Sequence, residues 1–284
     1  MMTWLKTHVL QVPDWLRARL GKPVFDAIMQ LQGQVFRDVP GRKTIRCELD
    51  GNAYFIKQHF GVGWGEIFKN LSSLRWPIIS AATEWQAIQK LGEVGIPTTP
   101  GVAYGWRGLN PASRQSFVVT RDLGDIISLE TLCAPWAETP PDPAFKRRLI
   151  LEVARLARLL HDNGMNHRDF YICHFCLDQP RWQQHNEIYL YLIDLHRVGI
   201  RSRIPPVARM KDIAALYFSA MNIGLTCRDI WRFLRAYRAQ PLRQTWQDER
   251  AFLEQVAARV CMSNSMAKCH PSSMTEFLYK GCWP

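Results

Sequence analysis

Twelve consecutive residues, Asn166 to Leu177, read NHRDFYICHFCL and combine two histidines, an Arg-Asp pair and two cysteines. Side chains of these types can hold a zinc ion, form a redox-active dithiol, or supply the base of a phosphoryl-transfer enzyme. The other residues of the chain must distinguish between these three kinds of site.

Zinc and redox chemistry explain few of these residues. Cys173 and Cys176 have the C-x-x-C spacing of zinc ligands, and His167 and His174 lie close to them. A structural zinc site usually needs a second ligand pair, and the sequence has no other C-x-x-C and no H-x-x-x-H motif. A redox dithiol would begin a helix in a thioredoxin-like βαβ unit, which the long helical pattern before this stretch does not provide. The simplest alternative is two small buried side chains.

Phosphoryl transfer explains more residues together. Asp169 ends a His-Arg-Asp sequence, the signature of a kinase catalytic loop whose aspartate accepts the proton of the acceptor hydroxyl. Asp194 ends the apolar stretch YLYLID, where kinases hold Mg²⁺. Upstream, Lys57 lies in YFIK, close to the kinase V-A-I-K pattern, and Glu84 begins a helical pattern where it could pair with Lys57. One such residue could be an ordinary surface charge, but the ordered set predicts a kinase active site.

The phosphate-covering loop of a kinase comes before the lysine strand, and DVPGRK occupies that position with a single glycine. Arg42 and Lys43 in this stretch could supply the charge that backbone amides supply in other kinases. The glycine-rich GVGWG sequence comes after the lysine strand, so it does not occupy that position. We therefore predict that Lys57, Glu84, Arg42 and Lys43 bind the nucleotide.

The metal site departs from the kinase pattern. Kinases place an asparagine five residues after the catalytic aspartate, and His174 stands there. An imidazole nitrogen suits transition metals better than Mg²⁺. Either His174 and Asp194 bind a metal that tolerates nitrogen, such as Mn²⁺, or one Mg²⁺ is held mainly by Asp194. In a third interpretation His174 only hydrogen-bonds the loop.

Strand and helix patterns in the sequence indicate which elements carry the candidate site residues. Residues 35–60 contain β-branched residues with turn signals at Pro40-Gly41 and Asp50-Gly51, and they predict three antiparallel strands with Lys57 near the end of the third. Residues 81–95 have helical spacing, and residues 115–123 return to strand.

Helices dominate the second half. Residues 139–164 predict a long capped helix, a short buried strand follows at 188–196, and further helices follow at 211–221 and 228–237. The predicted fold class is α+β: a bilobal protein-kinase-like fold with a small antiparallel-sheet N-lobe and a mainly helical C-lobe.

We expect four segments. Residues 1–32 form an N-terminal extension and helix, and residues 33–123 form the β-rich, nucleotide-binding N-lobe. Residues 124–262 form the helical C-lobe with the catalytic loop and the substrate site. Residues 263–284 form a poorly ordered tail, because they lack helical periodicity.

Composition limits the partners and the location. The net charge of +11 favours an anionic partner, such as nucleic acid, phosphorylated molecules or an acidic membrane surface, although it could equally be a solubilising surface. No apolar run is long enough to span a bilayer, no signal peptide is legible, and the eight cysteines are scattered as in a reducing compartment. We therefore expect a cytoplasmic protein.

The whole chain resembles the lipopolysaccharide core heptose(I) kinases, the RfaP/WaaP family of small atypical kinases, over roughly residues 24–245. HRDFYICHF and IDLHR are the most specific matches. The resemblance implies a monomer that uses ATP and Mg²⁺ to phosphorylate the first heptose of the lipopolysaccharide inner core, at the cytoplasmic face of the inner membrane. Phe170 stands where the family leads us to expect cysteine, and Cys176 where leucine is usual.

The segment after Asp194 favours a glycan acceptor over a peptide. A protein kinase would carry Asp-Phe-Gly, a long activation segment and Ala-Pro-Glu, but only LHRVGIRSRIPPVARM separates Asp194 from Lys211. Two alternatives are a kinase-fold enzyme acting on another small-molecule or glycan hydroxyl and a pseudokinase scaffold without turnover. A nucleic-acid-binding protein would show a recognition module, and none is legible, so we expect no nucleic-acid partner.

Residues 63–77, GWGEIFKNLSSLRWP, predict an amphipathic helix. The apolar residues on one face of this helix are Trp64, Ile67, Phe68, Leu71 and Leu74. The first interpretation is ordinary packing against the sheet. The alternative is a peripheral helix that contacts an anionic membrane surface and brings the enzyme to its lipid-linked substrate.

Overall fold

Residues 8–72 and 80–265 are described by a computed structural model of the chain. Contacts divide the chain into two units. The N-lobe consists of Met1–Gly92, Thr98–Gly124 and Asp194–Arg197, and the C-lobe of Glu93–Pro97, Asp125–Ile193 and Val198–Pro284. No helix of the described residues is long and apolar enough to cross a membrane.

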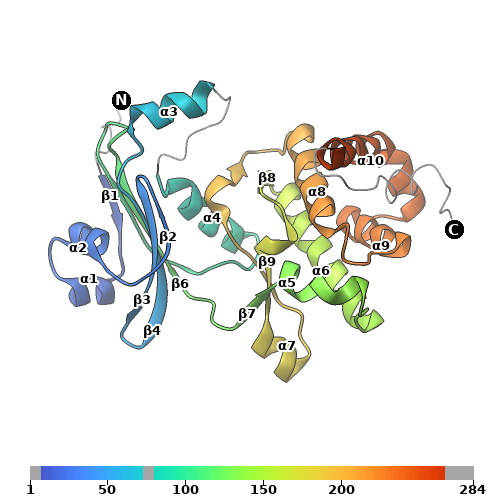
Figure 1. The fold of residues 1–284 in the computed structure, drawn as a ribbon, viewed down its shortest axis with the longest axis horizontal. Coiled ribbons are helices and arrows are strands. Elements are labelled where there is room, and N and C mark those ends of the chain that lie inside the picture. The colour runs from blue at the N-terminus through green and yellow to red at the C-terminus, as the bar shows by residue number, and fades with distance from the viewer. Residues whose placement is uncertain (1–7, 73–79, 266–284) are drawn as a thin grey trace. The chain divides into compact units, whose positions relative to one another are not determined.

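The N-lobe is built on an antiparallel sheet with the strand order β1-β5-β6-β4-β3-β2 (Figure 1). Its strands are β1 (His8–Gln11), β2 (Gln34–Val39), β3 (Arg42–Leu49), β4 (Asn52–His59), β5 (Gly101–Arg107) and β6 (Gln115–Arg121). The three strands expected at residues 35–60 are β2, β3 and β4, joined at the two predicted turns. Asp50 and Gly51 have φ of 50° and 74°, the left-handed conformation that a tight two-residue hairpin turn requires.

The first thirty residues complete this sheet. Strand β1 pairs with β5, while α1 (Asp14–Leu20) and α2 (Val24–Gln30) lie against one face of the sheet. Ile28 of α2 is fully buried in the same apolar core as Ile56 of β4 and Phe117 of β6. The residues expected to be an extension ahead of the N-lobe therefore contribute a strand and part of the core to it.

Helix α4 (Ala82–Glu93) covers the opposite face of the sheet (Figure 1). Trp85 stacks on Tyr104 of β5 with ring centroids 5.5 Å apart, and Ile88 and Leu91 are buried. This packing fixes the first turn of the helix, where Glu84 lies. The predicted helix at residues 81–95 is confirmed, and Gly95 follows it with φ of 74°.

The amphipathic helix expected at residues 63–77 is α3 (Gly63–Ser72), and its aromatic residues are not packed against the sheet. The side chains of Trp64 and Phe68 are 49% and 62% exposed. Packing against the sheet is therefore wrong for these two residues, because their rings lie in solvent. Leu74 lies outside the described residues.

The C-lobe is mainly helical. Its helices are α5 (Leu129–Cys133), α6 (Pro143–Asp162), α7 (Gln179–His185), α8 (Pro206–Ala220), α9 (Cys227–Arg238) and α10 (Leu242–Ser265), with short 3-10 turns at Ala134–Ala137 and Ile172–His174. Two small sheets join them: β10 (Leu190–Leu192), β9 (Phe175–Asp178) and β7 (Ile126–Ser128) in that order, and β11 (Gly199–Ile200) with β8 (Met165–Asn166).

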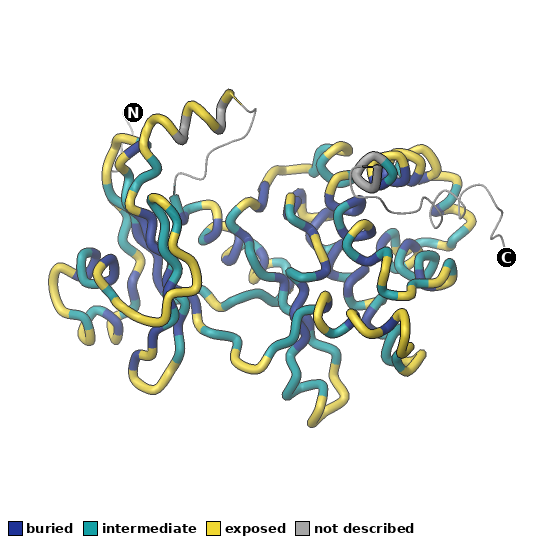
Figure 2. The backbone as a smooth tube through the Cα atoms, viewed as in Figure 1, coloured by how far each residue is buried: buried dark blue, intermediate teal, exposed yellow. Residues whose placement is uncertain are grey.

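Helix α6 forms the centre of the C-lobe, and it begins where the sequence predicts. The Asp142 carboxylate accepts a hydrogen bond of 2.8 Å from the amide of Phe145, and Pro143 occupies the first turn. Leu156 and Leu160 are fully buried, and Figure 2 shows the buried face that this helix shares with its neighbours. Helix α10 runs to Ser265, so the predicted tail begins as helix, and residues 266–284 lie outside the described part.

Candidate active site

Lys57 and Glu84 form the ion pair that the sequence predicts. Lys57 Nζ lies 2.6 Å from Glu84 Oε1, and the glutamate side chain is only 6% exposed. Strand β4 supplies the lysine and the first turn of α4 supplies the glutamate. A buried carboxylate at this distance fixes the direction of the lysine side chain, because charge-assisted hydrogen bonds are short and strong.

The carboxylate of Asp194 lies on the other side of the same lysine. Its Oδ1 atom is 4.0 Å from Lys57 Nζ and 2.6 Å from Nδ1 of His196. Asp194 has a φ of 62°, a conformation that residues other than glycine rarely adopt and that concentrates at functional sites. The lysine thus stands between two carboxylates within the N-lobe.

Basic side chains line the rest of this pocket. Besides Lys57, Glu84 and Asp194, the lining residues are Arg37, Arg42, Lys43, Thr44, Gln58, His59 and His196. Arg42 and Lys43, which the sequence predicts to bind nucleotide, therefore lie in the same pocket as the ion pair. Such a wall attracts an anion with several negative charges.

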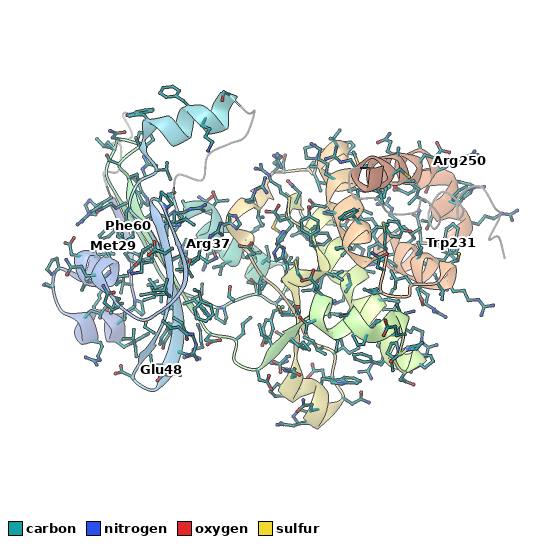
Figure 3. All side chains as sticks on the ribbon, viewed as in Figure 1. Met29, Arg37, Glu48, Phe60, Trp231 and Arg250 are labelled. Carbon is teal, nitrogen blue, oxygen red and sulfur yellow. The ribbon has the colours of Figure 1, made fainter. Side chains whose placement is uncertain are left out.

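Arg37 and His59 are among the lining residues that were not anticipated from the sequence. Arg37, which is labelled in Figure 3, lies on β2. The pairing of β2 with β3 shifts register between Val35 and Arg37. A β-bulge of this kind re-aims the side chains that follow it. His59 is buried, with only 5% of its surface exposed. This burial, together with the nearby positive charges of Arg42, Lys57 and His196, lowers the pKa of its imidazole to about 3. His59 is therefore neutral at physiological pH.

The catalytic loop of the C-lobe is held by a residue far away in the sequence. Asp212 of α8 accepts hydrogen bonds from the amide of His167 at 2.6 Å and from the amide of Arg168 at 2.9 Å. Its side chain is fully buried. Arg168 has a φ of 71°, so both bonds hold a turn that a side chain disfavours. The loop that presents half-buried Asp169 is therefore rigidly anchored.

His174 is oriented by this loop. Its Nδ1 lies 2.6 Å from the carbonyl oxygen of Asp169, so Nδ1–H donates and Nε2 is the nitrogen that carries the lone pair. His174 therefore makes the hydrogen bond to the catalytic loop that the third interpretation of this residue predicts. A metal-binding histidine is oriented by a hydrogen bond of the same kind, so the ligand role stays a prediction.

A magnesium ion fits the chemistry of Asp194. In residues 8–72 and 80–265 no three His, Cys, Asp or Glu side chains are grouped so that they could hold a metal by themselves. Mg²⁺ in kinases is held by one or two carboxylates together with substrate phosphates and water, so a single carboxylate facing a basic pocket is a suitable protein ligand.

The cysteines of the opening motif have the environment of packing residues. Cys176 is buried on β9, and burial raises the pKa of its thiol to about 11. Cys173 is half-buried in the preceding turn. Zinc ligation and thiol exchange both require the thiolate, which burial disfavours at Cys176.

A lysine–glutamate pair, a strand-end aspartate and an anchored His-Arg-Asp loop are the parts of a kinase, so the protein is a phosphotransferase. The sequence profile of the Lipopolysaccharide kinase (Kdo/WaaP) family matches residues 26–237, and the chain belongs to this family. The resemblance stated from the sequence motifs is confirmed, as is the α+β, bilobal, kinase-like fold class.

Named relatives agree with this assignment. The lipopolysaccharide core heptose(I) kinase WaaP of Escherichia coli is 49% identical over 239 residues, which cover 84% of this chain and 90% of the relative. The kinase of the same name from Pseudomonas aeruginosa is 48% identical over 82% of this chain and 87% of its own length. A solved structure, WaaP in complex with acyl carrier protein, is 42% identical, covers 89% of this chain and 98% of that chain, and has a TM-score of 0.76.

Proposed function

We propose that this kinase uses ATP to phosphorylate the first heptose of the lipopolysaccharide inner core. The observation that carries the proposal is the Lys57–Glu84 pair in a basic pocket, in a chain 49% identical to a kinase named for that reaction. The inner core is rich in phosphates and carboxylates, which the net charge of +11 suits.

The N-lobe residues bind the nucleotide in this proposal. Lys57, held by Glu84, pairs with the phosphates of ATP, and Arg42 and Lys43 neutralise further phosphate charge from β3. Asp194 would hold Mg²⁺, and a bound ion would supply positive charge beside the phosphates. His174 is a second metal ligand, and Mn²⁺ is then an alternative to Mg²⁺.

The C-lobe supplies the base. Asp169 accepts the proton of the heptose hydroxyl as that oxygen attacks the γ-phosphorus of ATP, and the bond to the bridging oxygen breaks to release ADP. The anchoring of the loop by Asp212 keeps this carboxylate in one position, so little ordering remains to be done when the acceptor binds.

The acceptor is attached to a lipid, so we place the enzyme in the cytoplasm, peripherally at the cytoplasmic face of the inner membrane, as a monomer. A peripheral contact is the mode of association that we propose.

Transfer of radiolabelled phosphate from ATP to purified unphosphorylated core glycolipid tests the function. The parent should label the glycolipid, and Asp169→Asn should lower kcat roughly 10²–10⁴-fold with unchanged ATP binding, since that is the usual contribution of a general base. Asp162→Asn, which changes an exposed carboxylate of the same lobe, is the matched control.

Each other result has a definite meaning. No labelling by a folded, ATP-binding parent would favour the pseudokinase alternative. Labelling of an unrelated glycan in preference to the core would favour the alternative acceptor. Activity of Asp169→Asn within about tenfold of the parent would reject Asp169 as the base.

A cavity in the C-lobe supports a second partner. About 100 Å³ of space lies between α6, α8 and α9, and almost every lining side chain is apolar, including Leu149, Val153, Leu216 and Phe233. One solved relative is described as a complex with acyl carrier protein. We propose that an acyl chain carried by such a protein enters this cavity, because a dry apolar space suits a hydrocarbon chain.

Binding of acylated and unacylated acyl carrier protein to the purified kinase tests this partner. Val153→Trp, which fills the cavity, should weaken binding of the acylated form. Leu151→Trp, an exposed position on the same helix, should not. Equal binding of acylated and unacylated carrier would reject the cavity as the acyl site.

A further inference from the structure

Large apolar side chains gather at one end of the N-lobe. Trp64 and Phe68 lie one turn apart on α3, their rings stack with centroids 5.8 Å apart, and both are exposed. Phe60, just before the helix, is 43% exposed, and Leu109, in the connection between β5 and β6, is 59% exposed. We call these four residues the aromatic patch. Scattered single apolar residues are normal on a surface, but four on adjoining segments call for a partner.

The backbone holds these segments together. The amide of Gly63 donates to the carbonyl of Ala112 at 2.9 Å, which joins the start of α3 to the connection that carries Leu109. Gly61 has a φ of 95°, and a Cβ there would lie 2.7 Å from the Ala112 oxygen and 2.9 Å from Ser113 Cα. Only glycine permits this approach. The outward placement of α3, visible in Figure 1, is therefore built into the fold.

The composition of the aromatic patch suits a bilayer interface. Tryptophan and phenylalanine are the side chains that amphipathic helices insert at the level of lipid headgroups. Lys69, adjacent to Phe68, is exposed, and Arg114, whose guanidinium lies over the Trp106 ring, ends the connection that carries Leu109. The net charge of +11 adds long-range attraction to anionic lipid.

The size of the patch argues against a second protein or a second copy. With full side-chain areas of about 150–250 Å² for aromatics, the exposed parts of the four residues amount to roughly 400 Å². A stable protein interface buries about 800 Å² on each partner. Insertion of a few side chains into a bilayer has no such area requirement, because it needs only to hold the enzyme peripherally.

We propose that the aromatic patch docks the kinase on an anionic phospholipid bilayer, and this rests on the proposed function because a membrane supplies the lipid-linked acceptor. Docking raises the local concentration of acceptor without contacting the reacting groups. The patch therefore affects the reaction with membrane-embedded glycolipid and leaves the reaction with a water-soluble acceptor unchanged.

Vesicle co-sedimentation tests the docking surface directly. The full chain is mixed with vesicles of phosphatidylcholine containing about one third phosphatidylglycerol and, separately, with pure phosphatidylcholine vesicles. The parent should bind the anionic vesicles, and Trp64→Ser with Phe68→Ser should weaken this binding at least about tenfold. The matched control is Leu151→Ser with Val207→Ser, which removes two exposed apolar side chains from the C-lobe and should bind like the parent.

Activity on two acceptors separates this inference from the proposed function. The Trp64/Phe68 double variant should phosphorylate delipidated core oligosaccharide at the parental rate and vesicle-embedded glycolipid several-fold more slowly. Failure of the parent on both acceptors would reject the proposed function, while vesicle binding would still be measured. Equal vesicle binding by parent and double variant would overturn the docking surface. So would a dimer in sedimentation velocity that only the double variant lacks.

Discussion

Replacement of Asp212 should show how strongly one buried carboxylate supports the catalytic loop. Its two oxygens accept from the amides of His167 and Arg168 at 2.6 and 2.9 Å, and both residues lie outside regular helix and strand. Arg168 is held at a φ of 71°, which costs roughly 1–2 kcal/mol for an L-residue. When the carboxylate is lost, the turn can relax and carry Asp169 with it.

The magnitude follows from the number of bonds that each substitution removes. A hydrogen bond to a charged group contributes about 1.5–3 kcal/mol. Asp212→Asn keeps one carbonyl oxygen but turns an NH₂ group toward the second amide, so it should lower the free energy of unfolding by about 2 kcal/mol. Asp212→Ala loses both acceptors and should lower it by about 4 kcal/mol.

Turnover should fall further than stability suggests. A misplacement of about 1 Å at a reacting group costs roughly 10²-fold, so kcat of Asp212→Ala should fall by about that factor. KM for ATP should change less than about threefold, because the lysine–glutamate pair lies in the N-lobe.

Urea denaturation and steady-state kinetics measure the two effects on the same preparations. Asp162→Asn serves as the control for loss of a C-lobe carboxylate. If Asp212→Ala unfolds within about 0.5 kcal/mol of the parent and keeps its kcat, the anchoring argument is refuted. If KM for ATP rises as much as kcat falls, the carboxylate acts on nucleotide binding instead.

Three further predictions concern the pocket and the metal. Glu84→Gln should lower kcat/KM for ATP roughly 10- to 150-fold without unfolding the chain, because the charge-assisted bond to Lys57 is lost. If the variant keeps the kcat/KM of the parent, the proposed role of the ion pair is contradicted. His59 keeps its imidazole neutral down to about pH 3, whereas the unfolded chain takes up that proton below about pH 6.5, so the protein loses stability as pH falls through this window. By pH 5 the loss of unfolding free energy amounts to about 2 kcal/mol. In His59→Gln the decrease in unfolding free energy between pH 7 and pH 5 should be smaller than in the parent by about that amount. An unchanged pH dependence would show that another group dominates. His174→Ala should raise the metal concentration that gives half-maximal rate, and His174→Asn should reduce any preference for Mn²⁺ over Mg²⁺. If metal dependence is unaltered in both variants, His174 is not a metal ligand and only hydrogen-bonds the Asp169 carbonyl.

The sequence predicts the parts of the fold and the site that depend on local signals. Turn chemistry at Asp50-Gly51 and a cap at Asp142 mark the strands and the long helix. The Lys57–Glu84 pair was also predictable, because each residue occupies a recognisable place on a strand or a helix. These signals depend on residues close together in the chain.

The remainder depends on contacts between distant residues. Asp212 is the one acidic residue of α8, and only the fold shows that it faces the amides of the catalytic loop. The single carboxylate in KDIAALYFSAM, just ahead of an apolar run, was the signal that could have suggested it. His59 and Arg37 look like ordinary strand residues in the sequence. Only the pairing of β2, β3 and β4 shows that both line one pocket. Trp64 and Phe68 have the spacing of core residues, and periodicity alone does not say which surface covers them.

The segment Asp194–Arg197 groups with the N-lobe although the chain on both sides of it belongs to the C-lobe. The lobes are therefore not successive modules of the chain, and a gene fragment ending at Gly124 would encode Lys57 and Glu84 without Asp194. Such a fragment would lack one of the two carboxylates that flank the lysine. Recombination within such a family should preserve the stretch from β1 to Asp212 as one block, because the first strand of the sheet, the segment Asp194–Arg197 and the anchor of the catalytic loop all lie within it.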